Sequence, residues 1–224
     1  MLQAAIVDLD GTMIDTLGDF VAALNLMLHD LDLPPVERAT VALFIGKGSE
    51  HLILSVLKHM AQRADAAARA VDPQALYPQA WDSYQRHYEV INGRHAEVFP
   101  GVQQGLLAMQ ARGLKMACLT NKPGAFARAL LQDKGLAGFF DVVFGGDAFE
   151  RKKPDPLPLI KTCEALAVPP QRTLMVGDSS NDAAAARAAG CPVVLVTYGY
   201  NHGEPIRAVD ADGFLDSLAD LRLD

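Results

Sequence analysis

Residues 3–16 read QAAIVDLDGTMIDT, and this stretch carries the strongest indication of the fold class. Its first part, 3–9, is a short apolar run, which is typical of a strand in a parallel sheet that is covered on both faces. Strand alternation places the side chains of Asp8 and Asp10 on the same side, and Gly11 permits a tight departure from the sheet. Two carboxylates this close repel each other unless a cation or a shared proton relieves them. The stretch therefore predicts a buried strand that ends in an acidic site.

Similar apolar runs recur along the second half of the chain, and a helical pattern separates each of them from the next. The predicted strands are residues 3–9, 114–119, 141–144, 173–176 and 192–196. The helices predicted between them are 101–112, 124–134, 157–167 and 181–189. Strands that alternate with helices in this way predict an α/β fold with a doubly wound, Rossmann-like parallel sheet.

The segment between the first strand and residue 94 has almost no strand pattern. Apolar residues recur at helical spacing after Thr16, and Thr16 with Asp19 offers a capping box at the start of the first helix. The predicted helices are 17–31, 49–62 and 73–91, with the Ala-rich piece 64–70 as a helix surface or a connector. We therefore predict an α/β core of residues 1–15 and 95–224 and a small α-helical cap domain, 16–94, inserted after the first strand.

Composition argues against several classes of function. The chain has 27 acids against 20 bases and a net charge of −7, so it offers no basic stripe for nucleic acid. Its longest apolar stretches, such as 193–196, are too short to cross a bilayer, and the N-terminus has no basic leader. We therefore expect a cytoplasmic protein without a membrane or nucleic-acid partner. The three scattered cysteines indicate neither a disulfide framework nor a zinc site, and no pattern specifies an oligomeric state.

Three more polar motifs follow predicted strands, at the edge of a parallel sheet where ligands bind. Thr120 and Asn121 stand at the start of a helix, where a hydroxyl, an amide and backbone N–H groups can cradle a phosphate. Lys153 is the second of a lysine pair beyond the third strand, and Asp178 and Asp182 stand where the fourth strand meets its helix. Each motif alone could be a chance pair, a turn or a helix cap. Their joint occurrence, each after an apolar strand, indicates one shared site.

Together with the DLDGT sequence at 8–12, these motifs resemble the four signature motifs of the haloacid dehalogenase superfamily. The resemblance covers essentially the whole chain, including the helical insert, and the second acid, Asp10, is typical of the phosphatase branch. It implies a phosphomonoester hydrolase in which the Asp8 carboxylate attacks phosphorus and forms an aspartyl-phosphate intermediate. Asp10 would give a proton to the departing alkoxide and then remove one from the attacking water.

The same resemblance implies how the metal and the phosphoryl group are bound. Mg²⁺, which prefers hard oxygen ligands, would be held by the side chains of Asp8 and Asp178 and by the backbone carbonyl of Asp10. Asp182 would lie behind these ligands and orient either metal-bound water or Lys153. The groups expected to hold the phosphoryl oxygens are Thr120, Asn121, Lys153 and the loop amides around Gly11.

The substrate is implied by a further likeness. The segment 197–206 and the form of the cap are similar to those of phosphoglycolate phosphatases, which implies the small phosphomonoester 2-phosphoglycolate. Lys47, between Gly46 and Gly48, is our candidate for binding the substrate, and a solvated lysine in a turn is the alternative reading.

Other functions remain open at this point. A phosphatase for a sugar phosphate or a nucleotide, or a phosphosugar mutase, would share these core motifs. A receiver-type signalling domain also groups acids, a threonine and a lysine, but it lacks D-x-D-G-T and an inserted cap.

Overall fold

The predicted strands form a parallel sheet in the computed structural model, which describes residues 1–63 and 71–222. Its strands are β1 (Ala4–Val7), β4 (Lys115–Leu119), β5 (Val142–Phe144), β6 (Thr173–Gly177), β7 (Val193–Val196) and β8 (Gly213–Leu215). Their order is β5-β4-β1-β6-β7-β8, and every neighbouring pair is parallel. This is the order of a doubly wound sheet, so the predicted fold class is confirmed. The Ala-rich piece 64–70, predicted as a helix surface or connector, lies outside the described residues.

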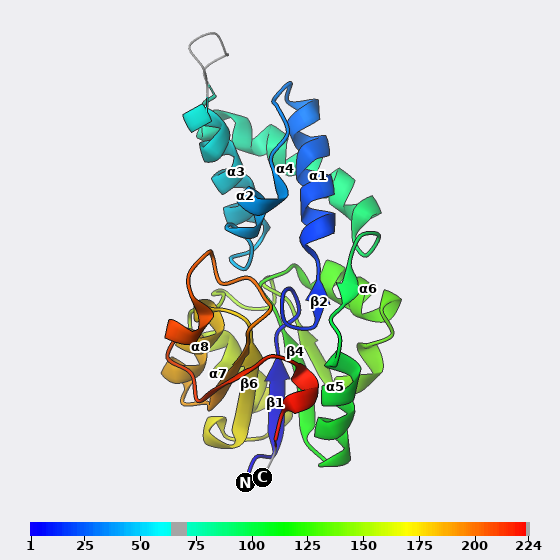
Figure 1. Cartoon of the computed structure of the whole chain (residues 1–224), viewed down its shortest axis with the longest axis vertical. Coiled ribbons are helices and arrows are strands. Elements are labelled where there is room, and N and C mark those ends of the chain that lie inside the picture. Colours follow the sequence, from blue (N-terminus) through cyan, green and yellow to red (C-terminus); the bar gives the residue numbers. More distant parts are fainter. Residues whose placement is uncertain (64–70, 223–224) are drawn as a thin grey trace.

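Helices cover both faces of this sheet because successive strand residues point to opposite sides. Ala5 and Val7 of β1 belong to one hydrophobic cluster, and Ala4 and Ile6 belong to another. The first cluster includes residues of α5 (Val102–Ala111) and α6 (Gly124–Asp133), and the second includes residues of α7 (Leu157–Leu166) and α8 (Ser180–Ala189). Figure 1 shows the two helix pairs on opposite sides of the sheet. Short 3₁₀ turns complete this part: η1 (Ala137–Phe139), η2 (Pro170–Arg172), η3 (Ile206–Ala208) and η4 (Leu218–Asp220).

Four further helices stand beyond the carboxyl ends of the strands (Figure 1). They are α1 (Leu17–Asp30), α2 (Arg38–Ala42), α3 (Ser49–Arg63) and α4 (Pro73–Ile91). Their apolar faces share a third hydrophobic cluster, which contains the fully buried side chains of Leu24, Ile53 and Tyr84. Among the described helices, none has both the length and the apolar character needed to cross a membrane.

The chain leaves and re-enters the core through a small second sheet. β2 (Ile14–Asp15) pairs antiparallel with β3 (Glu97–Val98) just below the four helices. We keep the division into a core, 1–15 and 95–224, and a cap, 16–94, as a proposal, which the separate hydrophobic cluster of the cap helices supports.

The predicted capping box at the start of α1 does not form. Thr16 occupies the N-cap position but makes no side-chain capping hydrogen bond. Asp19 is fully buried, and its carboxylate accepts hydrogen bonds from the backbone N–H groups of Gly93 (2.6 Å) and His95 (2.7 Å). The acid therefore ties the outgoing helix to the returning chain, because its buried carboxylate is the hydrogen-bond partner of two backbone donors there.

Candidate active site

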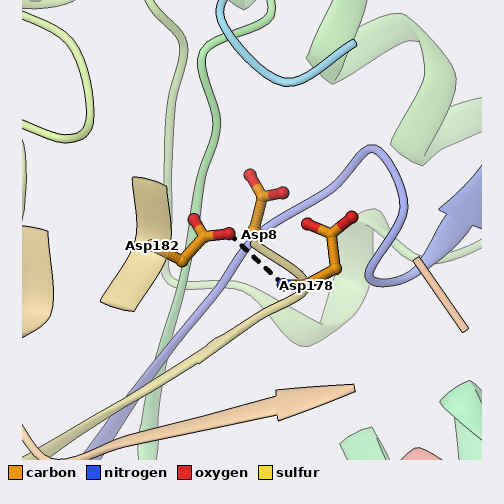
Figure 2. A group of neighbouring side chains, drawn as sticks. All are labelled: Asp8, Asp178 and Asp182. Atoms are coloured by element: carbon orange, nitrogen blue, oxygen red, sulfur yellow. Dashed lines mark hydrogen bonds between the residues drawn. The ribbon is translucent and has the colours of Figure 1, made fainter. Parts of the chain in front are cut away.

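Three carboxylates meet at the point where the strand order of the sheet reverses. Asp8 follows β1 and Asp178 follows the adjacent strand β6, while Asp182 lies in the first turn of α8. All three are buried, and one oxygen from each lies within 4.8 Å of the others. Figure 2 shows the three side chains around one common space. Open α/β sheets bind their ligands at such a switch point.

Burial makes this group of acids electrostatically unfavourable without a cation. Desolvation raises the pKa of Asp8 to about 7, although the ammonium group of Lys153 acts in the opposite direction. Burial also raises the pKa of Asp178 well above its usual value, and the neighbouring carboxylates of Asp182 and Asp8 raise it further. Carboxylates packed this closely are relieved by a positive ion.

Lys153 supplies part of the missing positive charge. Its Nζ donates hydrogen bonds to Asp8 Oδ1 (2.7 Å), Asp182 Oδ1 (2.7 Å) and the Leu119 carbonyl oxygen (2.9 Å). Burial alone lowers the pKa of Lys153, but the carboxylates of Asp182 and Asp8 raise it above its usual value overall. The lysine therefore stays charged, with its three donors satisfied, while its neighbour Lys152 is exposed.

Both carboxylate oxygens of Asp182 accept hydrogen bonds from other groups of the protein. Its Oδ1 accepts from Lys153, and its Oδ2 accepts from the Asp178 N–H, the Ser179 N–H and the Ser179 hydroxyl. The bond from the Ser179 N–H is one half of a capping box at the start of α8, and the Ser179 side chain accepts from the backbone N–H of Asp182 in the other half. Asp8 and Asp178 are then the better candidates for metal ligands. A buried set of carboxylate oxygens fits a hard divalent cation such as Mg²⁺.

Gly11 lets the loop after β1 approach this acidic group. Its φ is +86°, a left-handed conformation, and a Cβ at this position would lie 2.1 Å from Asp178 Oδ2. The next residue, Thr12, points its hydroxyl at Asp178 Oδ1 over 3.4 Å. A residue with a side chain at position 11 would therefore displace the Asp178 carboxylate or strain the loop.

Thr120 and Asn121 both line the pocket, but they differ in their contacts. The Thr120 hydroxyl accepts a hydrogen bond from the backbone N–H of Lys122 (3.2 Å). The side-chain amide of Asn121 donates to the carbonyl oxygens of Gly46 (3.0 Å) and Lys153 (2.9 Å) and accepts from the Lys153 N–H (3.1 Å). The Asn121 side chain therefore positions Lys153 and a cap loop, which does not support its predicted direct contact with phosphate.

Lys122 is a pocket residue that the sequence analysis missed. Its Nζ lies 3.1 Å from Asp10 Oδ1 and donates to the hydroxyl of Tyr88, and its side chain is 2% exposed. Lys122 follows directly after Thr120 and Asn121 in the sequence. Its position next to these two predicted site residues could have identified it as a pocket residue. Among the described residues that line the pocket, four carboxylates now face two lysines, which leaves a negative site for a divalent cation.

Lys47 is not brought into the pocket. Its neighbours Gly46 and Gly48 contribute to the pocket wall, whereas the Lys47 side chain is exposed. Burial lowers the pKa of both His51 and His202, and the charge of Lys47 lowers the pKa of each further. An exposed position in a turn is the alternative that the glycine-flanked sequence also allowed, and the substrate contact of Lys47 stays a prediction.

The segment that follows β7 reaches the acidic site. The Tyr200 N–H donates to Asp178 Oδ2 (2.6 Å), and the Tyr198 hydroxyl donates to the Thr12 carbonyl oxygen (2.9 Å). Tyr200 also donates its hydroxyl proton to Asp15, in β2. The segment 197–206 thus supports both the acidic group and the entry to the cap.

Comparison with known proteins gives the same family throughout the chain. The family model of haloacid dehalogenase-like hydrolases matches residues 5–196. A phosphoglycolate phosphatase of Thiobacillus denitrificans is 43% identical over 99% of this chain and 95% of its own length, and that of Escherichia coli is 38% identical over 96% and 88%. The crystal structure of a protein described as a predicted phosphoglycolate phosphatase from Haemophilus somnus covers 98% of this chain and 96% of its own, with 30% identity and a TM-score of 0.91. The chain belongs to the haloacid dehalogenase-like hydrolase family, as its four motifs predicted.

Proposed function

We propose that the chain hydrolyses 2-phosphoglycolate to glycolate and phosphate in a Mg²⁺-dependent reaction that passes through an aspartyl-phosphate on Asp8. The observation that carries the proposal is the buried Asp8 carboxylate, held by Lys153 and placed beside Asp178 at the switch point of the sheet. The names of the relatives in Thiobacillus denitrificans and Escherichia coli support the choice of substrate.

The first chemical step forms the intermediate on Asp8. Lys153 holds Asp8 Oδ1, so we expect the other carboxylate oxygen to attack phosphorus. The bond between phosphorus and the ester oxygen breaks as the new P–O bond to Asp8 forms. Asp10, the second pocket carboxylate on the same loop, gives its proton to the departing alkoxide.

The second step returns the enzyme to its starting state. Asp10, now ionised, takes a proton from a water molecule that attacks phosphorus, and the bond between phosphorus and Asp8 breaks. Lys153 offsets negative charge on the phosphoryl group, and the Thr120 hydroxyl lies in the same pocket wall. When bound, Mg²⁺ would be held by Asp8, Asp178 and the Asp10 carbonyl oxygen and would offset the charge of the phosphoryl oxygens.

A phosphate-release assay tests this proposal. The wild-type protein is incubated with 2-phosphoglycolate, a hexose phosphate, a nucleoside monophosphate and an aryl phosphate, with Mg²⁺ and with excess chelator. We expect the highest kcat/KM for 2-phosphoglycolate and no turnover under chelation. A clear preference for the sugar phosphate or the nucleotide would reject the substrate, and turnover that needs a sugar bisphosphate would indicate a mutase instead.

A further inference from the structure

Two buried lysines line the pocket, and the proposed mechanism uses only one of them. Lys153 contacts Asp8 and Asp182, on the side of the nucleophile. Lys122 contacts Asp10 instead, with its Nζ 3.1 Å from Oδ1 and 3.5 Å from Oδ2. Its charge is almost fully removed from solvent, which is costly unless the lysine is paired. The proposed mechanism therefore gives no role to the buried ammonium group of Lys122, which lies beside the general acid Asp10.

Lys122 lies where the core meets the cap helices. The residue belongs to the core loop between β4 and α6, while the aromatic rings beside it come from the cap: Phe20 from α1 and Tyr88 from α4. Its Nζ lies 4.7 Å from the centre of the Phe20 ring and 4.8 Å from that of the Tyr88 ring. Aromatic rings beside a buried ammonium group are attracted to its charge, and low-dielectric surroundings strengthen an ionic hydrogen bond such as that to Asp10.

The contact with Asp10 fixes which part of a substrate Lys122 can reach. A general acid must come within about 3 Å of the oxygen that it protonates, which here is the ester oxygen between phosphorus and the leaving group. The Lys122 Nζ, 3.1 Å from Asp10 Oδ1, therefore lies on the leaving-group side, within about 6 Å of that oxygen. A carboxylate one carbon away from the ester oxygen can bridge this distance with one hydrogen bond to Lys122.

We propose that Lys122 binds an anionic group on the leaving group, so that the enzyme selects small phosphomonoesters that carry a carboxylate next to the ester carbon. The inference rests on the proposed function, because it assigns Asp10 to the leaving oxygen. It replaces Lys47, which is exposed, with a lysine that lines the pocket. Lys122 is in this view a specificity-determining residue, and Tyr88 and Phe20 bring the cap against it.

The test compares substrates that differ in the charge of the leaving group. Phosphate release is measured for 2-phosphoglycolate, for ethyl phosphate, which is neutral at the same position, and for phosphoethanolamine, which is cationic. The wild-type protein should prefer them in that order. Lys122→Met should lower the ratio of kcat/KM for 2-phosphoglycolate to that for ethyl phosphate by about ten- to 150-fold, the worth of one hydrogen bond to a charged group. Both substrates share any loss that arises from a disturbed cap, so the ratio isolates the carboxylate contact.

Three further variants sharpen this result. Lys122→Arg keeps the positive charge and should keep part of the preference. Lys152→Met removes an exposed lysine next to the site and should leave the ratio unchanged. Lys47→Met is the competing candidate, and a fall of the ratio in this variant instead of in Lys122→Met would overturn the proposal. Thermal unfolding of each variant shows whether it is folded.

The outcomes separate this inference from the proposed function. A wild-type protein that hydrolyses 2-phosphoglycolate, with an unchanged ratio in folded Lys122→Met, overturns the inference and leaves the proposed function standing. Wild-type activity that is equal on all three substrates also overturns it, even if no variant folds. A wild-type protein that hydrolyses ethyl phosphate but not 2-phosphoglycolate rejects both the substrate and the inference.

Discussion

At the scale of single residues, the Asp8 carboxylate is placed between opposing electrostatic effects. Burial and the nearby acids favour its neutral form, while the hydrogen bond from Lys153 favours the charged form that can attack phosphorus. A cation beside Asp8 and Asp178 would shift the balance further toward the charged nucleophile. The reactivity of Asp8 therefore depends on its neighbours as much as on its own chemistry.

Replacing either acid of the DLDGT sequence with its amide tests the two assigned roles. Asp8→Asn keeps the shape of the side chain but removes the nucleophile, so kcat should fall by at least about 10⁴-fold. Asp10→Asn removes the proton donor and should cost about 10²- to 10⁴-fold on an alkyl phosphate. The loss should be smaller on an aryl phosphate, whose leaving group needs no proton. Substantial turnover by purified Asp8→Asn would reject the nucleophile assignment.

Gly11 provides a second test at this scale. Gly11→Ala puts a Cβ 2.1 Å from Asp178 Oδ2 and forces alanine into a left-handed backbone conformation. We expect kcat/KM to fall by about tenfold or more and the melting temperature to drop, because a strained φ costs about 1–3 kcal/mol. Gly138→Ala is the matched control, since its Cβ would have no atom within 4 Å among the described residues. Equal effects of the two changes would contradict the role given to Gly11.

The sequence located most residues of the site but not their side-chain contacts. Asp8, Asp178 and Lys153 could be placed from strand ends alone, because parallel strands deliver their carboxyl ends to one edge. Lys122 could not, since its partners Tyr88 and Phe20 come from cap helices whose packing no local pattern reveals. Lys47 was chosen for its flanking glycines, which describe the backbone and not the direction of the side chain.

At the scale of elements, the long helices and the apolar strands of the core could be predicted from the spacing of their apolar residues. The five predicted strands and the three predicted cap helices are present. The strands β2 and β3, with two residues each, were missed because so short a run carries no readable alternation. The strand β8 was also missed, although it has the same three-residue length as the predicted strand β5. The pairing of Ile14 with Val98 also depends on chain segments that are far apart in the sequence.

Asp19 allows the junction between these elements to be tested. Asp19→Ala leaves the N–H groups of Gly93 and His95 without their buried carboxylate partner. The free energy of unfolding should fall by about 3 kcal/mol, since two hydrogen bonds to a charged group are lost. Chemical denaturation measures this change, with Asp82→Ala on the exposed side of α4 as the control. A loss no larger than that of the control would show that Asp19 does not hold the junction.

At the scale of the whole molecule, specific side-chain contacts join the cap to the core. The ring of Phe126 in α6 packs edge-on against Tyr88 at 5.0 Å between centres, and Asn121 donates to the carbonyl of Gly46. The pocket between them gathers four carboxylates and two lysines in a chain whose net charge is −7. A divalent cation should therefore stabilise the folded protein as well as assist the reaction.

Thermal unfolding measures that stabilisation without any substrate. Mg²⁺ should raise the melting temperature of the wild-type protein, because an ion that binds only the folded state adds RT ln(1 + [L]/Kd) to its stability. Asp178→Asn should remove most of this shift, whereas Asp82→Asn, which changes an exposed acid by the same group, should retain it. An equal Mg²⁺-dependent shift in Asp178→Asn would contradict the assigned metal site.

Chemical trapping can detect the proposed covalent phosphoryl-enzyme at Asp8. The protein is mixed with 2-phosphoglycolate and Mg²⁺, quenched within one turnover and treated with borohydride, which reduces an aspartyl-phosphate to homoserine. Peptide mass spectrometry then locates the reduced residue. Asp10→Asn with an aryl phosphate should accumulate more of it, because the water attack on the intermediate lacks its base. We expect reduction at position 8 and at no other aspartate. Reduction at another aspartate, or none while phosphate is being released in the same sample, would contradict it.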